Sequence, residues 1–134
     1  MEYGRRELDL RIPAEPRAAA EARDTVRAAL ARVRPEVCED VRLLVSELVT
    51  NSVRHGGLRP HDEVRVHVRA TTAAVRVEVA DHGRGFDPAG VPGRGEAGGY
   101  GLVLVQRLAH RWGVDPTDGV NVWFELDEPY ERSA

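Results

Sequence analysis

Hydrophobic and polar positions alternate along four short stretches of the chain, which is the pattern of strands with one buried face. The alternation runs through residues 7–12, 63–70, 74–80 and 120–126. Only Thr71-Thr72-Ala73 separates the second stretch from the third, so we expect these two to form an antiparallel hairpin. The four stretches together predict a sheet with one face turned toward a hydrophobic core.

Three other stretches carry apolar residues at the three- and four-residue spacing of amphipathic helices. We expect helices over residues 18–34, 36–55 and 100–112. Pro35 suits the first turn of the second helix, and Gly56-Gly57 provides its end. The helices lie between the predicted strands in the sequence, so they can cover the sheet.

The order of the elements, β-α-α-β-β-loop-α-β, favours one α/β domain over residues 1–134. We expect a two-layer α/β sandwich, in which a mixed, mostly antiparallel sheet carries the helices on one face. The folded part is expected over residues 7–127, followed by a polar tail over 128–134 that frays. We expect three large aromatic side chains in the core, namely Trp112, Trp123 and Phe124.

Composition narrows the range of functions. The 19 basic residues are all arginine and stand against 22 acidic ones, and the net charge of −3 argues against nucleic-acid binding. Without lysine, neither a Walker-type P-loop nor a Schiff-base mechanism is possible. The sequence has no membrane-spanning apolar run and no signal-peptide pattern, so we expect a cytoplasmic protein without membrane contact. Its single cysteine, Cys38, is expected to be a small buried side chain.

Three polar residues follow one another at four-residue spacing in the second predicted helix, beside its apolar stripe. They are Glu47, Asn51 and His55, within the segment S-E-L-V-T-N-S-V-R-H-G, and they share one ridge of the helix. The amide oxygen of Asn51 suits a partly hydrated Mg²⁺ ion, and the carboxylate of Glu47 can polarise a water or a hydroxyl. Taken alone, the motif is explained at least as well by an ordinary solvated polar stripe.

Two glycine-rich stretches complete the pattern. Residues 81–85 read D-H-G-R-G, which places a carboxylate able to accept from an exocyclic amine beside a backbone that a flat ligand can approach closely. Residues 98–102 read G-G-Y-G-L and lead into a helix, whose first N–H groups can bind phosphate oxygens. Residues 82–101 hold eight of the 13 glycines, and a connection of this length is typical of functional loops. Taken separately, each stretch is also consistent with an ordinary turn or linker.

The combined order of these motifs is more specific than any one of them. E-x-x-x-N on a helix, D-x-G-x-G after a strand, a glycine-rich segment and G-x-G-L at a helix start together resemble the GHKL (Bergerat-fold) ATPase superfamily. The chain is most similar to the single-domain anti-sigma factor serine kinases, over roughly residues 7–127. This resemblance implies a homodimeric protein serine kinase that uses ATP and Mg²⁺. Such a kinase transfers the γ-phosphoryl group to a serine of a STAS-type anti-anti-sigma partner and sequesters a sigma factor.

The resemblance also implies roles for the matching residues. Glu47 would be the catalytic base, Asn51 would hold Mg²⁺, and Asp81 would bind the adenine amino group. Residues 86–98 would form a lid over the nucleotide. Further nucleotide-binding positions implied by the resemblance are Arg54, His55, Gly83, Gly85, Arg94, Gly99, Gly101 and Leu102.

Two features leave alternatives open. Kinases of this branch often carry an arginine directly before the second glycine box, whereas this chain has Ala97 there and Arg94 three residues earlier. Arg94 would reach the γ-phosphate only through closure of the lid. His55 either contacts the phosphate region or serves to close the helix. The alternative hypothesis is therefore a non-catalytic module that binds ATP or ADP together with a protein partner.

Overall fold

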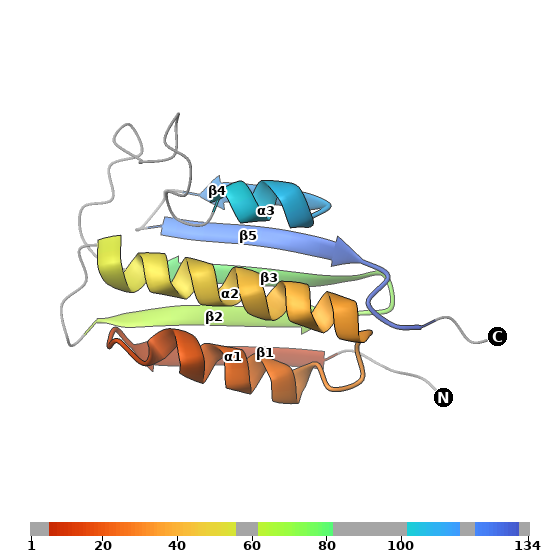
Figure 1. The fold of residues 1–134 in the computed structure, drawn as a ribbon, viewed down its shortest axis with the longest axis horizontal. Helices are drawn as coiled ribbons and strands as arrows, with labels where there is room; N and C mark the ends of the chain where they lie inside the picture. The colour runs from red at the N-terminus through yellow and green to blue at the C-terminus, as the bar shows by residue number, and fades with distance from the viewer. Residues whose placement is uncertain (1–5, 56–61, 82–101, 116–119, 132–134) are drawn as a thin grey trace.

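The described part of the protein is a two-layer sandwich of one sheet and three helices, with the helices on one face of the sheet (Figure 1). The computed structural model describes residues 6–55, 62–81, 102–115 and 120–131. The elements in chain order are β1 (Arg6–Pro13), α1 (Ala18–Ala29), α2 (Pro35–His55), β2 (Glu63–Ala70), β3 (Ala74–Asp81), α3 (Leu102–Leu108), β4 (Arg111–Asp115) and β5 (Val120–Asp127). The predicted α/β class and its two layers are confirmed.

The strands lie in the order β1-β2-β3-β5-β4, and each pairing between described neighbours is antiparallel. The predicted β2–β3 hairpin turns at Thr71, whose hydroxyl accepts the backbone N–H groups of Ala73 and Ala74 at 3.2 and 3.3 Å. Because β3 occupies the middle of the sheet, its last residue, Asp81, lies between β2 and β5. This central position accounts for the burial of an acidic side chain that an edge strand would leave in water.

The core lies between the sheet and α2. Alternation along β2 and β3 turns Val66 and Val77 toward the helices, and both are fully buried. The apolar stripe of α2 covers them with residues such as Leu44, which is also fully buried. Burial of each such side chain stabilises the folded state by about 1.5–3 kcal/mol. Cys38 belongs to this core as predicted, and burial raises the pKa of its thiol. The raised pKa fits a packing role rather than that of a nucleophile.

The third helix is shorter than its pattern predicts. The expectation of a helix over residues 100–112 is wrong beyond Leu108, where α3 ends, because the following residues form the edge strand β4. Gly113 disfavours helix, and β4 pairs with β5 so that Trp112 lies opposite Phe124. Strand pairing, a tertiary interaction, therefore outweighs the local helical spacing.

The first helix also ends before its predicted limit. A helix over residues 18–34 was expected, but α1 ends at Ala29 and the chain turns before α2 begins. The backbone of Leu30 leaves the helical region, with φ −105° and ψ 29°. Pro35 then disfavours a helical backbone at Arg34, because its ring crowds the residue before it.

The residues directly after β5 fold back onto the domain. Tyr130 is only 8% exposed. The backbone N–H of Arg34 donates to the carbonyl of Pro129 at 2.7 Å, and its Nε donates to the carbonyl of Glu128 at 2.9 Å. The expectation of a fraying tail is therefore wrong for these three tail residues, while the tail from residue 132 onward lies outside the described residues.

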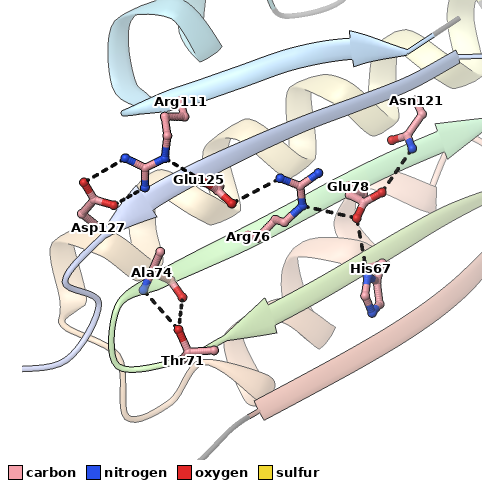
Figure 2. A network of polar contacts seen from close by, with 9 residues as sticks. All are labelled: His67, Thr71, Ala74, Arg76, Glu78, Arg111, Asn121, Glu125 and Asp127. Atoms are coloured by element: carbon pink, nitrogen blue, oxygen red, sulfur yellow. Dashed lines mark hydrogen bonds and ion pairs between the residues drawn. The ribbon is translucent and has the colours of Figure 1, made fainter.

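The face of the sheet opposite the helices carries a network of ion pairs (Figure 2). Arg76 of β3 contacts Glu78 at 3.5 Å and Glu125 at 3.2 Å, and its guanidinium lies 4.3 Å from the centroid of the Trp123 ring. Trp123 thus lies on this polar face, and its expected place in the core is wrong. Because side chains alternate along a strand, Trp123 and Phe124 cannot both face the helices, and Phe124 is the fully buried one.

Candidate functional site

Polar side chains are rare in the interior of this protein. Among the described residues, the buried polar or charged ones are Asn51, Ser52 and Asp81, at 9%, 8% and 3% exposure. Burying such groups costs free energy unless they find partners. Two of the three, Asn51 and Asp81, were predicted from the sequence to contact a nucleotide, so the burial pattern coincides with the predicted site.

Segments that are distant in the sequence bring these residues to one end of the sandwich. Asn51 lies one turn before the end of α2, and Asp81 is the last residue of β3, onto which α2 packs. Both elements finish at the same end of the molecule, and α3 begins with Leu102 on that side (Figure 1). A ligand at this end would therefore meet a helix, the centre of the sheet and the start of a second helix.

The amide of Asn51 has hydrogen-bonding capacity that the described residues do not use. Its Nδ2 is buried and donates to no described group, and an unsatisfied group of this kind costs about 1–3 kcal/mol. Amide oxygen and nitrogen exchange places by a half rotation, so the same position can present an oxygen. This unused capacity fits a residue that completes its bonding on a hydrated metal ion or on a ligand.

Glu47 lies one turn earlier on the same ridge of α2 and is half-buried. Its carboxylate forms no hydrogen bond or ion pair with any described residue. The neighbouring Ser46 points to the other flank of the helix, where its Oγ accepts from Arg23 Nη1 at 2.9 Å and ties α2 to α1. Glu47 is therefore left with a carboxylate that can accept a proton.

Three further residues that the sequence predicted for the site differ in position and in exposure. Arg54 is exposed and lines, with Glu15 and Thr50, a pocket of about 250 Å³ between α1 and α2. His55 is the last residue of α2, and its side chain lies outside the described part of the chain. Leu102 is half-buried at the start of α3, where it packs against the core. Arg54 thus lies at the surface, three residues beyond Asn51 on the same helix.

The glycine-rich half of the predicted site, including the expected lid over residues 86–98, lies outside the described residues, and so do the individual positions Gly83, Gly85, Arg94, Gly99 and Gly101. Within the described ranges, no three His, Cys, Asp or Glu side chains gather into a metal site.

Sequence reasoning gave Ser52 no functional role and missed one contact near the site. Ser52 follows Asn51 and is buried, which agrees with its helical spacing from the apolar positions of α2. The bond from Arg23 to Ser46 was also not foreseen, because nothing in the sequence pairs residues 23 positions apart on separate helices. In the sequence, the only available signal for a role of Ser52 or for the Arg23–Ser46 bond was the presence of a serine on each flank of the ridge that carries Glu47 and Asn51.

A buried acceptor at the end of the central strand, an amide on the covering helix and the start of a second helix lie at the same end of this α/β domain. Comparison with known families makes this specific. The chain matches the family model described as a histidine kinase-like ATPase domain over residues 12–124. It therefore belongs to the histidine kinase-like ATPase domain family, as the sequence motifs predicted, and this fold implies an ATP site.

Two curated relatives are anti-sigma F factors from Clostridium botulinum. The chain is 34% identical over 83 residues to the protein of strain Eklund 17B and 32% identical over 83 residues to that of strain Alaska E43. Each match covers 60% of this chain and 58% of the relative. The chain thus spans somewhat more than half the length of these relatives, and they support the predicted resemblance to the anti-sigma branch.

Solved structures share the fold. The RsbU and RsbW domains of Rv1364c from Mycobacterium tuberculosis superpose with a TM-score of 0.66 at 22% identity, over 96% of this chain and 34% of that one. A blue-light activated histidine kinase from Erythrobacter litoralis gives a TM-score of 0.58 at 24% identity, over 87% and 46% of the two chains. In the described ranges, none of the helices has the length and apolar character that a bilayer crossing requires.

Proposed function

We propose that this protein is an ATP-dependent protein serine kinase that regulates transcription as an anti-sigma factor. It transfers the γ-phosphoryl group of ATP to a serine of a STAS-type anti-anti-sigma partner, and it sequesters a sigma factor. The observation that carries the proposal concerns two side chains one turn apart on α2. The buried Nδ2 of Asn51 and the carboxylate of Glu47 have no bonding partner among the residues that the structure describes. The names of the two Clostridium relatives support the regulatory part.

The described residues fit distinct tasks in this reaction. Asp81, buried at the end of the central strand β3, accepts a hydrogen bond from the adenine amino group. Asn51 holds Mg²⁺, which when bound neutralises the phosphate charge that develops during transfer. In this proposal, phosphate oxygens would bind the backbone amides at the start of α3, which begins at Leu102.

Glu47 supplies the acid–base step. Its carboxylate takes the proton from the acceptor serine hydroxyl while the serine oxygen forms a bond to the γ-phosphorus. The bond between the γ-phosphorus and the oxygen bridging to the β-phosphate breaks, and ADP leaves. Because Glu47 is half-buried on α2 and lacks a described partner, no existing ion pair has to break before it accepts the proton.

The partners and location belong to the same proposal. We infer a homodimer that binds one sigma factor or one STAS-type protein, acts in the cytoplasm, and contacts neither nucleic acid nor membrane directly. The net charge of −3 agrees with a protein partner rather than with a nucleic acid.

A binding-only role is the second candidate. It is favoured by Ala97, which stands where related kinases often carry an arginine for the γ-phosphate. In that case the protein would hold ATP or ADP to stabilise the conformation that binds its partner. Arg94 would have no part in transfer.

Phosphoryl transfer from labelled ATP to candidate STAS proteins separates the two roles. For Glu47→Ala we expect a loss of transfer of roughly 100-fold or more, with the Kd for ATP unchanged within about threefold. Asp40→Ala is the matched control, because Asp40 is a half-buried carboxylate on the same helix two turns away. Normal ATP binding without label on any partner would support the binding-only role, and equal loss of transfer in the control would exclude Glu47 as a specific base.

A further inference from the structure

One side-chain hydrogen bond joins the two longer helices, which lie side by side over the sheet (Figure 1). Arg23 Nη1 of α1 donates to Ser46 Oγ of α2 at 2.9 Å. Between the described residues of α1 and α2, it is the only hydrogen bond that side chains form. Arg23 pairs with no described carboxylate, so no ion pair draws its guanidinium away from the serine. The bond therefore ties one point of α2 to α1.

The other buried side chains of α1 are small and apolar. Ala18, Ala22 and Val26 are fully buried on this helix. Small side chains let two helices approach closely, but apolar contact has no preferred direction. A hydrogen bond, in contrast, weakens steeply when its donor and acceptor are out of line. The bond between Arg23 and Ser46 is thus the directional contact between these helices, and it opposes rotation of α2 about its own axis.

The rotation of α2 matters because Ser46 directly precedes Glu47 in the sequence. Neighbouring residues of a helix point about 100° apart, so the serine reaches toward α1 while Glu47 lies on the ridge of Asn51. Side-chain ends lie roughly 5–6 Å from a helix axis, so a rotation of about 10° moves them by about 1 Å. Glu47 forms no bond with a described residue, and its position therefore follows that of the α2 backbone.

We propose that Arg23 is a positioning residue for phosphoryl transfer, which acts through Ser46 to hold Glu47 within reach of the acceptor hydroxyl. The inference rests on the proposed function, in which Glu47 takes the proton of the acceptor serine. A misplacement of about 1 Å can lower a rate roughly 100-fold. Asn51 is only 9% exposed, and the packing around it holds its side chain. Loss of the bond should therefore affect transfer more than nucleotide binding.

Steady-state transfer from labelled ATP to a STAS-type protein that the wild type phosphorylates tests the positioning role. For Arg23→Ala we expect kcat to fall roughly tenfold, with the Kd for ATP and the KM for the STAS protein unchanged within about threefold. Arg23→Lys should retain about half or more of kcat, because the bond to Ser46 uses a single donor, which an ammonium also supplies.

Arg27→Ala is the matched control. Arg27 lies one turn further along α1, is exposed, and belongs to no described hydrogen bond or ion pair. It should leave kcat at the wild-type value. Urea unfolding shows that every variant is folded at the assay temperature, so that a lower kcat does not reflect unfolded protein.

A double-mutant cycle tests the route through Ser46. Ser46→Ala removes the acceptor and should lower kcat as much as Arg23→Ala does. The double variant should be no slower than either single variant, because both substitutions break the same bond. Losses that multiply in the double variant would contradict this route. The pH profile of kcat should keep its shape in Arg23→Ala, and a shifted profile would show that Arg23 acts by its charge instead.

The remaining outcomes separate this inference from the proposed function. A wild type that transfers phosphate to no STAS protein would contradict both. Normal wild-type transfer with full kcat in Arg23→Ala would contradict only the positioning role, and the bond would then serve the stability of the helix layer alone. A higher KM for the STAS protein at unchanged kcat would also overturn the positioning role, because Arg23 would then act in partner binding.

Discussion

Asn51 and Asp81 are buried although each is an expensive residue to bury. Asn51 lies among the apolar side chains of α2, and Asp81 lies at the centre of the sheet. Replacing either residue with an apolar one of similar volume would remove the free-energy cost of taking a polar group out of water. The fold alone therefore gives no reason for a polar residue at these positions. Positions of this kind, where function opposes stability, are where ligand-binding residues are found in other proteins.

Asp81→Asn is the sharpest test of a single position. The substitution keeps the shape of the side chain but presents either a weaker acceptor or an amide donor to the adenine amino group. We expect the Kd for ATP to rise roughly 10- to 100-fold, since a hydrogen bond to a charged group contributes about 1.5–3 kcal/mol. Isothermal titration measures the Kd. An unchanged affinity would remove Asp81 from the site, and a urea melt of the variant shows whether its fold is retained.

The polar face of the sheet connects strands through their charges. Arg111 of β4 donates to Glu125 of β5 at 2.6 Å and also pairs with Asp127, so that edge strand β4 is held by side chains as well as by its ladder (Figure 2). Asn121 of β5 donates to Glu78 of β3 at 3.2 Å and extends the network across the sheet. A single exposed ion pair contributes little, but a connected network holds several strands in register.

The network predicts a loss of stability in acid. The hydrogen bond from Arg111 lowers the pKa of Glu125 despite its partial burial, and Arg76 lowers it further. Burial raises the pKa of Glu78, but the bond from Asn121 together with Arg76 outweighs this and leaves it lowered. Because both folded-state pKa values lie below the ordinary 4.5, their contribution is complete above pH 4.5 and disappears as the pH falls through the lowered values.

Urea melts between pH 7 and pH 3 measure this dependence. We expect Glu125→Gln to lower the free energy of unfolding by about 1 kcal/mol at pH 7. As the pH falls, the stability of this variant should decrease less than that of the wild type. Glu63→Gln is the control, because Glu63 is exposed on β2 and belongs to no described ion pair. An acid profile of Glu125→Gln identical to that of the wild type would show that the network does not stabilise the fold.

The segment after β5 lies at the end of the molecule opposite the candidate site (Figure 1). It passes beside the turn between α1 and α2, where Arg34 bonds to two of its carbonyls. Glu128 has a positive φ of 50°, and its N–H donates to the carbonyl of Ala73 in the β2–β3 turn at 3.0 Å. The last described residues thus join the helix layer to the sheet layer.

Removal of the Tyr130 ring tests this closure. Tyr130→Ala should lower the free energy of unfolding by about 2–4 kcal/mol, because it deletes a buried aromatic ring. Tyr130→Phe keeps the ring and should cost about 1 kcal/mol or less. Denaturant unfolding measures both variants. If Tyr130→Ala had the stability of the wild type, the segment would only rest on the surface. The affinity for ATP should be unchanged in both variants, because the candidate site lies at the other end of the molecule.

Local patterns predicted much of the fold and the centre of the candidate site. Alternation identified β1, β2, β3 and β5 because each has one face in water and one in the core. The three-and-four spacing identified α2 with the ridge of Glu47 and Asn51, and the D-x-G-x-G motif identified Asp81. The strands and the helix follow from the geometry of a single element, so they are readable without knowledge of its neighbours. The roles expected of Glu47, Asn51 and Asp81 came instead from the resemblance of the combined motifs to the GHKL superfamily.

Other features depend on contacts between distant segments, which periodicity does not record. Residues 111 and 112 were predicted to end a helix over residues 100–112, yet they form the start of β4 because β5 offers ladder partners. Trp123 faces the polar side because Phe124 fills the core, and Gly113 leaves room for its indole, since a Cβ there would lie 2.6 Å from the ring nitrogen. Tyr130 is buried next to two residues whose carbonyls accept bonds from Arg34, 94 and more positions away in the sequence. The local preferences of the chain determine which segments form helices and strands. Burial and strand pairing, which are tertiary interactions, determine where these elements end and which way Trp123 faces. They also bring Asn51 and Asp81 to the same end of the molecule.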